Sequence, residues 1–263
     1  MGTTKLEDER SKGCLGRLFQ KSMSEKTIYE KISASGVWRE ALAIIRRYPL
    51  AAIMPAAVLG AVAEAPYYFI DDSYPVWEQI LASLTSAVAF YLFVAYAEEV
   101  AAEAERGAAR LTLRDVLGKL QHAIPIVPPV IVASTIVFGT AAVATVLLVL
   151  PGLWLLTRWS LFASVIKTER LGPVAALKRS NQLVRGHFWA VFLTATLAFI
   201  FEEIVIDMGG SAGVLVSDSE TWGEYIGAVI AGSLISPLAA FTTATTYRRL
   251  TNARTLAQED HYQ

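Results

Sequence analysis

Cysteine is nearly absent from this sequence, in which Cys14 is the only one among 263 residues. A single thiol excludes an internal disulfide, and its surroundings fit no metal-binding motif. The chain has only three histidines, His122, His187 and His261, and none lies at metal-ligand spacing from another. The sequence therefore predicts neither a disulfide-stabilised fold nor a metal centre, and it indicates no cofactor.

Motifs that carry catalysis are also missing. The sequence has no glycine-rich phosphate-binding loop, nucleophile elbow or zinc-protease motif, and the segments between its apolar stretches are too short for a catalytic domain. We therefore expect that the protein is not an enzyme. Lys and Arg number 23 against 24 Asp and Glu, so the charge gives no indication of nucleic-acid binding.

The first 22 residues lack the apolar core of a signal peptide. Leu6 stands where a myristoylation signal that begins at Gly2 needs Ser or Thr. We expect residues 1–22 to be disordered, with Met23 as an alternative start. The whole of residues 1–34 is predicted to form a cytosolic, disordered segment.

Apolar residues are abundant, at 54% of the chain against 18% charged. They occur in blocks of about 20 residues, the length that crosses a hydrocarbon core of about 30 Å. The sequence predicts an all-α polytopic membrane domain over residues 35–250, followed by a cytosolic tail, 251–263. Its six predicted spans are residues 48–70, 79–97, 125–149, 151–167, 188–206 and 226–247.

Several predicted spans contain proline, including Pro55, Pro66 and Pro237. Transmembrane helices tolerate proline because neighbouring groups satisfy the carbonyls it frees. Two interpretations stay open: kinks that serve packing, or a discontinuous helix that forms a transport site.

Basic residues alternate between the predicted connections. Ten Lys and Arg precede the first span, four lie between spans two and three, five around the link between spans four and five, and three after span six. The connections on the opposite side contain no Lys or Arg, and their charged residues are all acidic. Because short basic flanks stay in the cytosol, the pattern predicts a plasma-membrane protein with both termini cytosolic.

A short amphipathic basic segment precedes each odd-numbered span, at residues 38–47, 111–120 and 175–185. Such segments suit the inner headgroup region, where anionic lipid attracts Lys and Arg. They are either linkers that lie on the bilayer or a site for lipid headgroups or a partner protein. The candidate contact residues are Arg46, Arg47, Arg114, Lys119, Lys178, Arg179 and Arg185.

Small residues recur every fourth position in the sixth span. Such a stripe lets a second helix approach closely, either inside the monomer, which we favour, or in a homo-oligomer. The stripe consists of Ala228, Gly232, Ser236, Ala240 and Ala244.

Four ionisable residues lie inside predicted spans: Arg158, Glu202, Glu203 and Glu64. At about 1.5 Å of rise per residue, Arg158 and Glu202 both come within about 10 Å of the outer surface. Charges there are costly and usually pair or face a cavity. We expect Arg158 to pair with Glu202 or Glu203, with Glu64 as a third member. The group would be a structural ion pair, a substrate or proton site, or a set of charges exposed to water.

Residues 151–192 contain a distinctive series of features. These are Pro151–Gly152, Arg158, Glu169 before Gly172–Pro173, the Ala-Leu-x-x-Ser run ending at Ser180, Leu183–Gly186 and Trp189. In this combination they resemble the membrane domain attached to some glycerophosphoryl diester phosphodiesterases, which also occurs in stand-alone multi-pass proteins. The resemblance implies a six-helix membrane domain. The phosphodiesterase is not implied, because its His-Arg-Gly opening and paired acidic metal ligands are missing.

These observations predict a non-enzymatic membrane protein that binds or organises lipid or a partner protein at the inner leaflet. The alternative is a small-solute transporter or channel-like protein that uses Arg158, Glu202 and Glu64.

Overall fold

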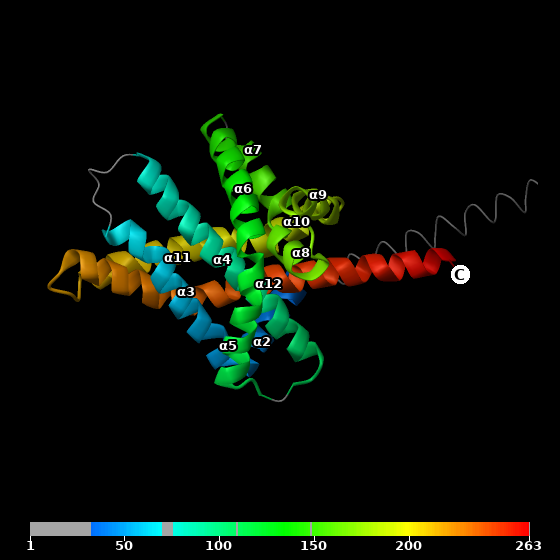
Figure 1. Cartoon of the computed structure of the whole chain (residues 1–263), viewed down its shortest axis with the longest axis horizontal. Helices are drawn as coiled ribbons and strands as arrows, with labels where there is room; N and C mark the ends of the chain where they lie inside the picture. The colour runs from blue at the N-terminus through cyan, green and yellow to red at the C-terminus, as the bar shows by residue number, and fades with distance from the viewer. Residues whose placement is uncertain (1–32, 70–75, 109, 148, 263) are drawn as a thin grey trace, which may run out of the picture.

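The computed structural model describes residues 33–69, 76–108, 110–147 and 149–262 (Figure 1). The described chain is helical and contains no strand. Six helices are long and apolar enough to cross a membrane, which confirms the predicted all-α polytopic fold. They are Pro49–Phe69, Ala82–Glu105, Leu113–Ala141, Val149–Glu169, Phe188–Val214 and Glu220–Thr255. The predicted disordered segment 1–34 lies almost entirely outside the described residues.

The first hairpin is formed by α2 (Ala34–Arg47), α3 (Pro49–Phe69) and α4 (Val76–Glu105). Helix α3 continues through both of its prolines without a break, as α12 does through Pro237. Helix α4 extends eight residues beyond the predicted end of its span at residue 97. Four glutamates mark the end of the apolar run, yet the helix continues because each of them pairs with a cation of another helix.

The second hairpin begins with α5 (Leu113–Ala123), which passes through a 3-10 turn (Ile124–Ile126) into α6 (Val127–Leu147). Thr112 caps α5, since its side chain accepts from the Asp115 amide while the Asp115 carboxylate accepts from the Thr112 amide. The return is divided into α7 (Val149–Trp159) and α8 (Phe162–Glu169). The predicted fourth span is therefore broken at residues 160–161.

The third hairpin follows α9 (Pro173–Val184) and comprises α10 (Phe188–Val191), the π-helical η2 (Phe192–Thr196), α11 (Leu197–Val214) and α12 (Glu220–Tyr262). The predicted tail begins as part of α12, which continues to Tyr262. Helices α2, α5 and α9 precede the odd-numbered spans. That they are amphipathic helices at the membrane surface stays a prediction.

Helices α11 and α12 approach each other closely through glycines. A Cβ atom on Gly213 would lie 1.9 Å from the carbonyl oxygen of Gly223, and one on Gly227 would lie 2.2 Å from that of Gly209. The predicted small-residue stripe lies one position away from this contact line. Its members Ala228, Gly232, Ala240 and Ala244 are buried within the monomer, which agrees with the preferred interpretation.

The three hairpins fan apart toward their tips, while α2, α5, α8 and α9 lie at the opposite end of the bundle (Figure 1). We call this opposite end the basic end, because the predicted basic segments lie there. Large side chains such as Phe93, Tyr96, Phe162 and Phe241 are fully buried between the helices. The Tyr96 hydroxyl donates to the Ala51 carbonyl at 2.8 Å and so joins α4 to α3.

Candidate functional site

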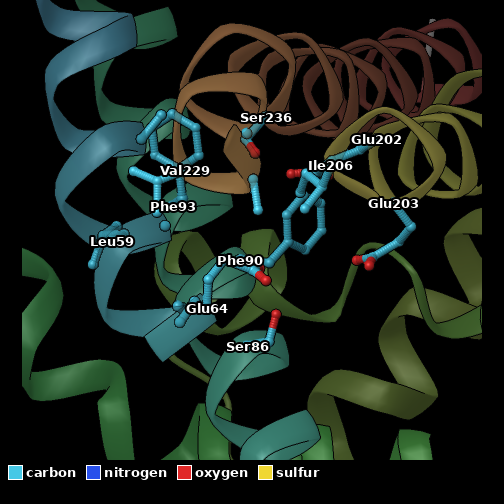
Figure 2. Close-up of a pocket in the computed structure, with 16 residues that line it drawn as sticks. Leu59, Glu64, Ser86, Phe90, Phe93, Glu202, Glu203, Ile206, Val229 and Ser236 are labelled. Carbon is cyan, nitrogen blue, oxygen red and sulfur yellow. The ribbon is translucent and has the colours of Figure 1, made fainter. Parts of the chain in front are cut away.

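A pocket lies between α3, α4, α11 and α12 (Figure 2). Its empty volume is about 470 Å³, including the part open to the outside. Most of its wall is apolar and comes from alanines and glycines together with Leu59, Phe90, Phe93, Ile206 and Val229. Its polar lining consists of Glu64, Ser86, Glu202, Glu203 and Ser236. The tertiary structure thus gathers three of the four predicted intramembrane charges around one space.

The three carboxylates differ in burial. Glu203 is exposed, Glu64 is partly buried, and Glu202 is only 4% exposed. The Glu202 side chain interacts with Ser236, but its Oε2 atom is buried and has no hydrogen-bond partner. Burying a carboxylate without a compensating partner is costly. Glu202 is therefore the side chain of this pocket that most needs a ligand.

Arg158 does not join these carboxylates. It donates from Nη1 to Oδ1 of Asn181 at 2.7 Å, and its guanidinium carbon lies 4.1 Å from the ring centroid of Trp154. Within the part of the chain that the structure describes, no ion pair links Arg158 to Glu202, Glu203 or Glu64. The predicted pairing is therefore corrected. Depth along a span was the basis for it, and depth does not specify which neighbouring helix a side chain faces.

Residues that carry the family resemblance contact one another. Glu169 accepts from Arg179 at 3.0 and 2.9 Å and from the Tyr247 hydroxyl at 3.2 Å, which links α8, α9 and α12. The Ser180 hydroxyl lies at the break between α7 and α8, where it accepts from the Leu161 amide at 3.3 Å. The signature is thus a set of contacts that hold α9 against its neighbours.

Three of the seven predicted inner-leaflet residues are engaged inside the protein. Lys119 pairs with Glu103 at 3.2 Å, and Arg179 pairs with Glu169. Arg47 donates to the carbonyl oxygens of residues 107 and 108 at 3.3 and 2.8 Å. The remaining four are exposed: Arg46, Arg114, Lys178 and Arg185. These four carry exposed charges at the basic end.

The sequence analysis did not predict that glutamates of α4 pair with cations at the basic end. Arg248 of α12 pairs with Glu105 and lies 3.9 Å from Glu98, which is 2% exposed. Lys167 of α8 pairs with Glu99. The signal was available in the run Glu98–Glu105, which contains four glutamates at the end of an otherwise apolar helix. These pairs connect α4 to α5, α8 and α12.

Three carboxylates line the pocket: Glu64, Glu202 and Glu203. In the described residues no group of three or more His, Cys, Asp and Glu side chains has an arrangement that could hold a metal ion. The geometry is that of distributed negative charge in a mostly apolar space.

Comparison with known proteins gives no further assignment: no family model, no curated protein and no solved structure matches this chain. The resemblance to the phosphodiesterase-associated membrane domain stays a prediction from residues 151–192.

Proposed function

We propose that this protein binds a small solute in the pocket between α3, α4, α11 and α12 and moves it through the membrane, as a transporter or channel-like protein. The observation that carries the proposal is Glu202, a buried carboxylate that lines an open pocket and has an oxygen without a partner. Ionisable residues inside spans mark substrate and ion pathways. The substrate sites of many secondary transporters lie near the middle of the membrane.

A purely structural role suits the carboxylates of the pocket less well. At the basic end, Glu99, Glu103 and Glu105 each form an ion pair that joins two helices. Glu64, Glu202 and Glu203 form no such pair within the described residues. Charges that served only to hold helices together would be paired, as those at the basic end are.

The proposed setting is the plasma membrane, with both termini in the cytosol and the hairpin tips outside. The distribution of Lys and Arg along the chain supports this orientation. The test uses Cys14→Ser as background, with Ser217→Cys at a hairpin tip and Arg110→Cys at the basic end. A membrane-impermeant thiol reagent should label position 217 in intact cells and position 110 only after permeabilisation. The reverse pattern would invert the topology.

Solute access to the pocket tests the function itself. In the Cys14→Ser background, Ser86→Cys and Ser236→Cys should react with a small, water-borne thiol reagent because both positions line the pocket. Ser134→Cys is the matched control, since Ser134 is fully buried and is not part of the pocket wall. Reaction at neither pocket position would exclude a water-accessible solute site.

A second candidate function is binding of anionic lipid, or of a partner protein, at the basic end. It is favoured by the four exposed cations, which accompany exposed apolar side chains Leu42, Leu113, Leu117 and Val174 on α2, α5 and α9. Native mass spectrometry should then show lipid or partner held at fixed stoichiometry. Replacing Arg46, Arg114, Lys178 and Arg185 by Gln should release it. A bare monomer from native membrane would contradict this candidate.

A further inference from the structure

We infer that the pocket between α3, α4, α11 and α12 accepts an organic monocation with an apolar body, and that Glu202 is the counter-charge. This inference rests on the proposed function, because it names the class of solute for the same pocket. It depends on three features of the pocket wall: the sign of its charges, its apolar composition and the burial of one unpartnered oxygen.

The charges of the wall exclude an anion and disfavour a neutral solute. Glu64, Glu202 and Glu203 line the pocket, and its described lining contains no Lys, Arg or His. An anionic solute would be repelled by all three carboxylates. A neutral solute without a donor would leave Oε2 of Glu202 buried and without a hydrogen-bond partner. A neutral donor would satisfy that oxygen but supply no counter-charge to the three carboxylates.

The remainder of the wall favours an organic cation over a metal ion. A hard divalent cation such as Ca²⁺ takes about 6–8 oxygen ligands at close range, and the described carboxylates do not converge in that way. Phe90 and Phe93 face the pocket together with Leu59 and Ile206. Aromatic faces attract cations, and apolar walls stabilise a hydrocarbon body. An ammonium group attached to a compact apolar group satisfies both parts of the wall.

The three carboxylates also form a gradient of burial. Glu203 is exposed, Glu64 is partly buried, and Glu202 is almost completely buried. An exposed carboxylate beside the pocket raises the local concentration of cations. The buried carboxylate then interacts with the cation where water is scarce and the attraction is stronger. In this arrangement Glu203 attracts the cation toward the pocket, and Glu202 forms the ion pair with it.

The test is equilibrium binding of radiolabelled benzylammonium to the full-length protein in nanodiscs of zwitterionic phosphatidylcholine. This probe is a cation at neutral pH, its N–H groups can donate to Oε2 of Glu202, and its body is compact and aromatic. We expect saturable binding that weakens at least about tenfold in Glu202→Gln, a change of about 1.4 kcal/mol. Glu220→Gln removes the same charge from an exposed residue outside the pocket and should bind the probe as wild type does.

Two further variants separate pairing from folding. Glu202→Asp keeps the charge and should retain binding within a few-fold of wild type. Gly60→Leu keeps Glu202 but fills the pocket, because Gly60 lines it and a Cβ atom there meets no other atom within 4 Å. It should abolish binding while the protein remains monodisperse.

Each remaining outcome decides the matter. Equal affinity in wild type and Glu202→Gln would overturn the inference, as would equally strong competition by ethylbenzene, the uncharged isostere of the probe. Ca²⁺ could instead displace the probe from wild type but not from Glu202→Gln. That result would show that the pocket takes a metal ion and not an organic cation. If Ser86→Cys reacts with a water-borne reagent but the probe does not bind, the solute class is wrong while the pocket function stands. If Ser86→Cys does not react and the probe does not bind, both the pocket function and the solute class are wrong.

Discussion

The hydroxyl of Ser180 on α9 donates a hydrogen bond to the carbonyl oxygen of Arg158 on α7, at 2.9 Å. The same hydroxyl accepts from the Leu161 amide at the break between α7 and α8. One side chain thus satisfies a donor and an acceptor that the broken helix leaves without intrahelical partners. This contact fixes α9 beside the return helix of the second hairpin.

Ser180→Ala should therefore lower the free energy of unfolding by about 1–3 kcal/mol, because it leaves buried backbone groups unsatisfied. Thermal unfolding of the detergent-purified protein measures the change. Ser211→Ala is the control, since the Ser211 hydroxyl donates to the Asp207 carbonyl on an exposed stretch of α11. Equal stability of the two variants would show that the contact across the break is unimportant.

The partner of Arg158 can be identified by double-mutant cycles. Arg158→Gln combined with Asn181→Ala should show a coupling energy of about 0.5–3 kcal/mol, as residues in contact do. Arg158→Gln combined with Glu202→Gln should be additive within about 0.5 kcal/mol, since no ion pair joins them. Coupling of Arg158 to Glu202 in place of Asn181 would restore the arrangement expected from sequence.

Arg248 should be important for stability at the basic end. Its guanidinium lies 3.9 Å from Glu98, whose carboxylate is buried and also interacts with the side chain of Ser164. Arg248→Gln leaves that charge uncompensated and should destabilise the fold by about 3 kcal/mol.

Adding Glu98→Gln to Arg248→Gln should recover part of the loss, because the uncompensated charge is removed with its partner. Chemical unfolding curves of the three variants provide the comparison. No recovery in the double variant would assign the effect of Arg248 to Glu105, its other partner.

The contact between α11 and α12 depends on glycine. Gly213→Ala would place a Cβ atom 1.9 Å from the Gly223 carbonyl oxygen, so the helices would have to separate. We expect a loss of about 1–3 kcal/mol. Gly139→Ala on α6 is the control, because its Cβ atom meets nothing within 4 Å; it should be neutral or stabilising. A tolerated Gly213→Ala would contradict the close approach.

Much of the architecture could be predicted from local patterns. The spans followed from apolar length, and the buried stripe of Gly232 and Ala240 followed from helical periodicity. Each of these features depends on short stretches of chain, which is why the sequence alone determined them.

Only the tertiary structure decided which groups meet. It separated Arg158 from the carboxylates, paired Lys119 and Arg179 inside the protein, and extended α4 through Glu105. It also placed Glu202 beside an open pocket. These outcomes depend on the rotation of each helix about its axis and on its lateral neighbours. Residue spacing within one helix specifies neither, because the contacts join segments far apart in the chain.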